Sequence, residues 1–279
     1  MSAFSDLTFT TDNIVCLAVT VAVLFLIPLA FGLIWRKRHK EQLKIKYLLA
    51  GAVCFILFAR VLELGVHYLC IIMDNPVSRF INESDIAYVL YGIVLAGVFE
   101  ECGRYIILKY FMKKDRSSEN AVLFGIGHAG IEIWTVIVPS ISMYLVIALI
   151  IYSGNFDTLS LLNITEETAN AYLPLATAAS EFGGFMLAMN VMERMLTMFV
   201  HVGLTIIVFF GVTKNKKSFL PLAIILHMIV DLFAALYQRS IVSLWLSEVW
   251  VAMWTAIIIY IALKLYRKMK PQFSNNDVL

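Results

Sequence analysis

The sequence predicts an all-α fold, a polytopic bundle of helices that crosses a membrane. Hydrophobic residues make up 61% of the 279-residue chain and charged residues 15%, whereas soluble domains are roughly 45–50% apolar and about 25% charged. The mean hydropathy is +0.83. We therefore expect an integral membrane protein whose surroundings are the lipid bilayer, with no nucleic-acid partner.

Seven apolar stretches are long enough to cross a bilayer as helices, which takes about 20 residues. They cover residues 14–35, 47–72, 86–111, 121–152, 186–212, 219–238 and 244–264. No repeat or low-complexity tract interrupts the chain. We therefore expect a single transmembrane domain over residues 1–279.

Basic residues gather on one side of the predicted bundle, after the first, third, fifth and seventh stretches. They are Arg36, Lys37, Arg38, Lys40, Lys44 and Lys46, then Lys109, Lys113, Lys114 and Arg116, then Lys214, Lys216 and Lys217, and finally Lys264, Arg267, Lys268 and Lys270. The opposite loops, 73–85 and 153–184, are mainly acidic. Because loops rich in Lys and Arg stay in the cytoplasm, we expect the N-terminus outside and the C-terminus in the cytoplasm.

Several ionisable residues lie inside the apolar stretches, where a charge costs about 2.5–3.5 kcal/mol on insertion scales. Four stretches carry polar pairs spaced four residues apart: Glu100 with Arg104, His128 with Glu132, His201 with Thr205, and His227 with Asp231. Residues four apart share one face of a helix. At about 1.5 Å per residue, these pairs lie roughly 10–16 Å from the cytoplasmic ends of their helices. We expect them to meet in one layer.

The residue types in this layer favour chemistry over conduction. A buried glutamate can act as a general base on water, and histidines can donate hydrogen bonds to an oxyanion or bind a metal. Asp231, one turn after His227, can fix the orientation of that imidazole ring. The spacing alone leaves the metal-binding and metal-free alternatives open.

Three motifs resemble those of the glutamate-dependent intramembrane proteases, a superfamily that includes CAAX prenyl proteases, PrsW and APH-1. "FEECGR" at 99–104 resembles the EExxR motif, "FGIGHAGIE" at 124–132 the FxxxH motif, and "HMIVD" at 227–231 the HxxxN/D motif. With "HVGLT" at 201–205 and the seven-span plan, the chain is most similar to the YhfC family, bacterial membrane proteins described as intramembrane metalloproteases. The resemblance implies a multi-pass protein of the bacterial cytoplasmic membrane that acts on a membrane-embedded or membrane-proximal protein substrate.

The resemblance also implies roles for the residues of the first two motifs. Glu100 matches the catalytic glutamate that activates water, and Glu101 and Arg104 complete that motif. His128 matches the histidine of the second motif. Glu132, four residues later, lies outside the core pattern and is an additional site candidate.

The third motif implies that His227 and Asp231 stabilise the oxyanion. Asp231 stands where the prenyl proteases have asparagine, and an ionised aspartate cannot donate a hydrogen bond, which puts a direct donor role in doubt. His201, outside the three core motifs, is a further site candidate.

A zinc site is one reading of the histidines. His128, His201 and His227 can hold zinc with an open position for water, with Glu100 as the base. A metal-free glutamate mechanism remains the alternative, because no HExxH motif is present.

Some polar and small residues have a structural interpretation. We read Arg60 with Glu63, and Glu193 with Arg194, as ion pairs. The glycines of "GIGHAG" at 125–130 match a nucleotide-binding pattern only by chance, since no strand precedes them. We expect them to allow close helix packing around His128.

The favoured hypothesis is an intramembrane peptidase that hydrolyses a peptide bond at or just inside the cytoplasmic boundary of the membrane. The rival is a noncatalytic membrane scaffold or a transporter whose buried charges move protons or hold partner helices. A transporter typically shows internal repeats with interrupted spans at matching positions. The sequence shows neither feature.

Overall fold

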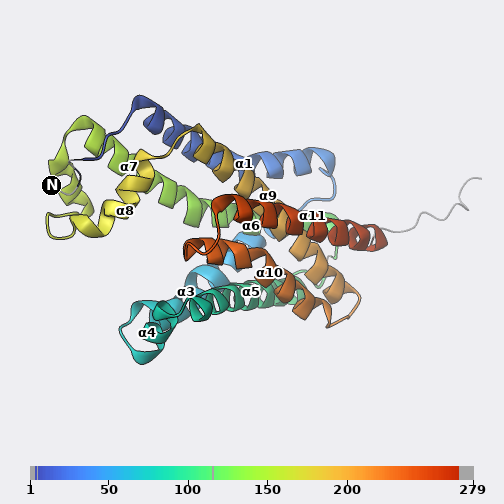
Figure 1. Ribbon diagram of the computed structural model, residues 1–279. Helices are drawn as coiled ribbons and strands as arrows, with labels where there is room; N and C mark the ends of the chain where they lie inside the picture. The colour runs from blue at the N-terminus through green and yellow to red at the C-terminus, as the bar shows by residue number, and fades with distance from the viewer. Residues whose placement is uncertain (1–3, 5, 115, 270–279) are drawn as a thin grey trace, which may run out of the picture. The chain divides into compact units, whose positions relative to one another are not determined.

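The computed structural model of the protein describes Phe4 and residues 6–114 and 116–269, and most of these residues lie in helices (Figure 1). This part of the chain contains helices and turns and no strand. The all-α fold class is therefore confirmed. Lys270, one of the basic residues expected after the last span, lies outside the described residues.

Among the described residues, seven helical segments are long and apolar enough to cross a membrane. They are Thr11–His39, Ile45–Ile72, Asp85–Tyr110, Ser118–Ser153, Gly184–Thr213, Phe219–Gln238 and Leu244–Met269. Each overlaps one predicted stretch, so the number of spans is confirmed. The orientation of the termini stays a prediction.

Five spans are single α-helices, and two are composite. The single helices are α1 (Thr11–Arg38), α5 (Asp85–Tyr110), α9 (Gly184–Thr213), α10 (Phe219–Gln238) and α11 (Leu244–Met269). The second span joins α2 (Ile45–Phe55), the π-helix η2 (Ile56–Glu63), α3 (Leu64–His67) and the π-helix η3 (Tyr68–Ile72), and the fourth joins α6 (Ser118–Glu132), the π-helix η4 (Ile133–Ile137) and α7 (Val138–Ser153). The shorter elements are α4 (Pro76–Glu83), the 3₁₀-helix η5 (Phe156–Leu162) and α8 (Ala169–Ser180).

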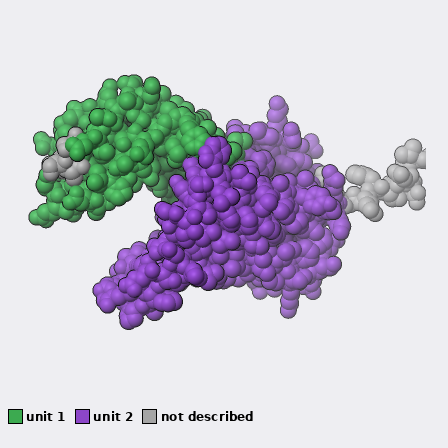
Figure 2. Space-filling view, in the orientation of Figure 1, with its two compact units in different colours: residues 1–29, 133–195 green, residues 30–132, 196–279 purple. Residues whose placement is uncertain are grey.

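The chain divides into two compact units, shown in different colours in Figure 2. The first comprises residues 1–29 and 133–195. Within it, α7 packs against α8 and η5, around a core that includes Ile147, Leu159 and Ala176.

The second unit comprises residues 30–132 and 196–279 and contains every predicted site residue. Within it α2 packs against α6, α5 packs against η2 and α10, and α10 also packs against α11. The motif-bearing helices α5, α6, α9 and α10 all contribute to this unit.

The glycines of the second unit let helix backbones touch. A Cβ atom on Gly51 of α2 would lie 2.0 Å from the carbonyl oxygen of Phe124, and one on Gly127 of α6 would lie 2.0 Å from that of Leu48. A Cβ on Gly125 would lie 2.9 Å from Cα of Val202 in α9. The expectation that glycines pack helices closely next to His128 is therefore confirmed.

One of the two expected ion pairs forms and the other does not. Arg194 bonds to Glu193. Glu63 instead lies 3.4 Å from His67, while Arg60 is exposed and has no ion-pair or hydrogen-bond partner among the described residues. The Arg60–Glu63 prediction was wrong because these residues lie in a π-helix, whose wider turn moves residues three apart onto different faces.

We expect Gly127→Ala to destabilise the protein, because the added methyl group must push α2 and α6 apart. The loss should be about 1–3 kcal/mol, as for other overpacked cores, and should appear as earlier unfolding in detergent. Gly92→Ala in α5 is the matched control, since a Cβ there meets nothing within 4 Å. Equal stability of the two variants would contradict the close α2–α6 contact.

Candidate active site and metal centre

Helix α5 places a buried arginine beside two buried glutamates. Arg104 and Glu101 have no exposed surface, and Glu100 is 7% exposed. Arg104 donates through Nη1 to Glu101 Oε1, and its Nη2 lies 4.0 Å from Glu100 Oε2. Two carboxylates therefore balance one guanidinium, at the i,i+3 and i,i+4 positions that share a helix face.

Helix α6 brings His128 to Glu100. The ring of His128 is fully buried, and its Nε2 lies 3.0 Å from Glu100 Oε2. Phe55 of α2 packs edge-on against this ring, with centroids 5.3 Å apart. Nδ1 of His128 has no hydrogen-bond partner in the described part of the chain.

Helix α10 brings His227 to Glu101. Nδ1 of His227 lies 2.8 Å from Glu101 Oε1, the same oxygen that accepts from Arg104. Nε2 faces the other way and lies 3.3 Å from Asp231 Oδ2. His227 is thus held between two carboxylates, one of which, Asp231, has a side chain that is 35% exposed.

Helix α9 places His201 between Glu100 and Glu132. Its Nδ1 lies 3.0 Å from Arg104 Nη2 and 3.7 Å from Glu100 Oε2, and its Nε2 lies 2.7 Å from Glu132 Oε2. A guanidinium can only donate, so Nδ1 of His201 accepts from Arg104 and its proton sits on Nε2, beside Glu132. A carboxylate in this position fixes the tautomer of a histidine.

The four helices thus bring together all eight residues that the sequence singled out. The ring centroids of His128 and His201 are 5.2 Å apart, and those of His201 and His227 are 5.5 Å apart. The polar contacts of the site form two branches that meet at Arg104. One runs through Glu101 to His227, and the other runs through Glu100 to the remaining two histidines.

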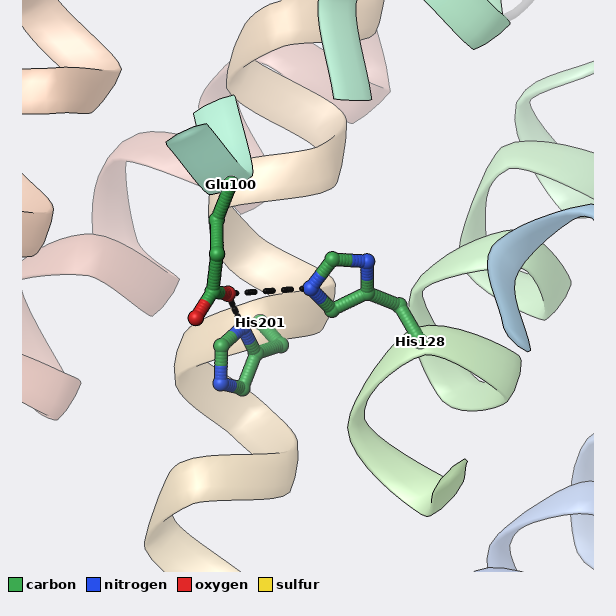
Figure 3. Close-up of side chains that lie close together, drawn as sticks. All are labelled: Glu100, His128 and His201. Carbon is green, nitrogen blue, oxygen red and sulfur yellow. Dashed lines mark hydrogen bonds and ion pairs between the residues drawn. The ribbon is translucent and has the colours of Figure 1, made fainter. Parts of the chain in front are cut away.

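Glu100, His128 and His201 form a group that can hold a metal ion (Figure 3). One donor atom from each lies within 4.8 Å of the other two. Tetrahedral zinc with bonds of about 2.0–2.2 Å needs donors roughly 3.3–3.5 Å apart, and Glu100 Oε2 lies 3.0 Å and 3.7 Å from the two imidazoles. Two histidines and one glutamate are also a donor set of catalytic zinc, which keeps a fourth position open. The residues fit the ion.

This group differs from the three histidines expected from the sequence. Glu100, expected as the base, provides a donor atom, and His227 is not part of the group found among the described residues. The physical reason is that the ring nitrogens of His227 face Glu101 and Asp231, whereas His128 and His201 each direct one nitrogen toward Glu100.

In two of the four pairs that were predicted to share a helix face, the second residue bonds to a group other than the side chain of the first. Glu132 meets His201 of α9, although it shares a face of its own helix with His128. Thr205 donates its hydroxyl to the backbone oxygen of His201 at 2.7 Å and does not bond to the ring. Spacing along one helix carries no signal for the contact between Glu132 of α6 and His201 of α9.

We expect Arg104→Met to lower the free energy of unfolding by about 3–5 kcal/mol, because removing one partner of a buried pair leaves the other charge uncompensated. Adding Glu101→Gln should recover part of this loss. Denaturation of the two single variants and the double variant in detergent measures the coupling. A double variant no more stable than Arg104→Met alone would rule out the pair as the main contact of Arg104.

Comparison with known proteins places this site in a family. A family model described as YhfC intramembrane metalloprotease matches residues 23–251. The Bacillus subtilis (strain 168) protein described as uncharacterized membrane protein YhfC is 31% identical over 257 residues, which cover 92% of this chain and 97% of that protein. No solved structure matches the chain. The chain is therefore a multi-pass integral membrane protein that belongs to the YhfC family.

Proposed function

We propose that the protein is an intramembrane metallopeptidase that hydrolyses a peptide bond of a membrane-associated protein. The observation that carries the proposal is the meeting of Glu100, His128 and His201 inside a membrane-spanning bundle, with donor atoms within 4.8 Å of one another. The description of the family supports the same class of activity.

Glu100, His128 and His201 would hold a zinc ion. Bound zinc lowers the pKa of water and polarises a carbonyl group. Glu132 supports this arrangement, because it lies beside Nε2 of His201 and leaves the Nδ1 lone pair directed toward Glu100. Arg104 also donates a hydrogen bond to this lone pair. If an ion took the lone pair, Arg104 would keep its bond to Glu101.

Glu100 can combine two tasks because its carboxylate has two oxygens. Oε2 faces the histidines. Oε1 receives no hydrogen bond from the described residues and can take a proton from the attacking water. The same group then returns that proton to the leaving amine, as a general base followed by a general acid.

His227 would stabilise the negative charge that develops on the carbonyl oxygen. Glu101 holds the ring through Nδ1 at 2.8 Å. The longer contact, 3.3 Å from Nε2 to Asp231, is the weaker one, so Nε2–H is the donor that can turn to substrate. Asp231 acts through His227 in this scheme, which resolves the difficulty that an ionised aspartate cannot donate.

We expect the zinc content of single variants to show which histidines bind the metal. Purified wild-type protein should carry near-stoichiometric zinc, and His128→Ala and His201→Ala should each lose it, because each removes a donor. His227→Ala should keep the metal, and His39→Ala is a control at the end of the first span. Loss of zinc in His227→Ala with retention in His201→Ala would restore the three-histidine site, and a metal-free wild type would favour the metal-free glutamate mechanism.

We expect Glu100→Gln to reduce hydrolysis by at least about 10²-fold, as for the loss of a general base, and to weaken zinc binding. The substrate is a single transmembrane segment flanked by two epitope tags, reconstituted in the same liposomes, and cleavage is followed by separation of the tags. Glu83→Gln on α4 is the matched control.

The result also distinguishes the rival function. Cleavage that survives Glu100→Gln would reject the proposed role of this residue. A wild-type protein that neither binds zinc nor cleaves any segment in a panel of such substrates would favour the scaffold or transporter.

A further inference from the structure

A second line of polar residues runs between the second span and α5, outside the site described above. The hydroxyl of Tyr91 lies 3.0 Å from Nδ1 of His67, and Nε2 of His67 lies 3.4 Å from Glu63 Oε1. We call Glu63, His67 and Tyr91 the polar seam.

The register of the two helices shows that the seam leads toward the site. A Cβ on Gly103 of α5 would lie 2.3 Å from the ring of Phe58, while His67 meets Tyr91. The second span and α5 therefore run antiparallel, and Glu63 lies between the levels of Tyr91 and Glu100. At about 1.5 Å per residue, Tyr91 and Glu100 are roughly 13 Å apart along α5.

Side-chain exposure increases from Glu63 to His67, away from the site. The side chain of Glu63 is 10% exposed and that of His67 is 32% exposed, and Tyr91 is half-buried. Ionisable groups within membrane spans generally face the bundle interior or a water-filled space, because lipid cannot hydrogen-bond to them. A graded seam of this kind is better matched to water than to lipid.

The backbone of the second span supports the same view. π-Helical segments lie on both sides of His67, at η2 and η3, and π-helical distortions are frequent at functional sites. Arg60, within η2, is exposed without a partner among the described residues. An arginine in the middle of a span also requires water or an anion nearby.

We propose that the polar seam admits water to Glu100 from the end of the bundle where α4 lies. Each hydrolysed peptide bond consumes one water, whose hydroxyl adds to the carbonyl carbon while its proton goes to the amine. The side chain of Asp231 is 35% exposed, so a substrate would reach the site at Asp231 and keep water away from that side. The seam supplies water by another route. The role of the seam in supplying water for hydrolysis rests on the proposed function, whereas the presence of water in the seam does not.

Thiol accessibility tests the seam without any substrate. Single cysteines replace Glu63, His67 or Tyr91 in a full-length protein whose own cysteines, Cys16, Cys54, Cys70 and Cys102, are changed to serine. The proteins are reconstituted in liposomes and treated with a charged, membrane-impermeant methanethiosulfonate, which reacts with the thiolate. Leu64→Cys is the matched control, since Leu64 is an exposed apolar neighbour, and Asp74→Cys on the α4 side marks full accessibility.

We expect all three seam cysteines to react at least roughly tenfold faster than Leu64→Cys, because a thiolate forms readily only where water reaches the sulfur. Reaction no faster than that of Leu64→Cys at any seam position would overturn the proposal. Reaction at positions 67 and 91 without reaction at position 63 would overturn it too, because the route would stop short of Glu100. Thermal unfolding of each variant identifies any that fail to fold, and for such a position hydroxyl-radical footprinting of the unsubstituted residue against Leu64 gives the same comparison.

A second measurement connects the seam to turnover. His67→Phe should lower the rate of cleavage severalfold while zinc content stays at the wild-type value, because the ring blocks the seam without touching the metal group. Unchanged cleavage would overturn the role in water supply. If the wild type does not cleave at all, the proposed function fails, while the accessibility result still decides whether the seam is hydrated.

Discussion

The buried guanidinium of Arg104 is the constraint on which the rest of the site depends. A charge inside a membrane-spanning helix is tolerated only when neighbouring groups satisfy it. Arg104 has no exposed surface, so its N–H groups must find partners within the bundle. Nη1 and Nη2 find Glu101 and His201, while Nε has no hydrogen-bond partner in the described part of the chain. Through Glu101 the network reaches His227, and through Glu100 it reaches His128. Satisfying one cation thereby fixes the relative positions of α5, α6, α9 and α10.

Close packing of the backbones makes these short connections possible. Lipid provides little hydrophobic driving force between helices, so small residues and hydrogen bonds hold membrane bundles together. Gly97 brings α5 against Ile224 and Met228 of α10, and Gly203 brings α9 against Ile258 of α11. These contacts lie within a few turns of the motif residues, so a histidine on one helix can reach a carboxylate on the next.

The sequence predicted the spans and the membership of the site for clear physical reasons. Bilayer thickness sets the length of an apolar helix, and charges are rare enough inside apolar stretches that each one marks a candidate. The sequence did not predict which residues meet across helices, because a spacing of four residues identifies a shared face but not the helix that packs against it. Glu132 therefore went to His201, and Glu100 took the place among the metal donors that was expected for His227. The sequence also contains no indication of the π-helices, because a uniformly apolar run such as 56–59 shows no periodicity. For this reason Arg60 and Glu63 were wrongly predicted to pair.

The contact between α2 and α6 has a consequence for how the bundle can open. Gly51 and Gly127 place main chain directly against main chain, so no side chain there can change rotamer to absorb a displacement. His128 is carried by this rigid pair and cannot swing aside without separating the two helices. Any opening of the site would therefore have to involve elements other than α2 and α6, as in enzymes whose catalytic groups sit on a fixed scaffold beside a moving one. Helix α10 bears the partly exposed Asp231 and meets Gly97 of α5 through the side chain of Met228 as well as the backbone of Ile224, so a shift of α10 would have to repack that side chain and break the contact of His227 with Glu101.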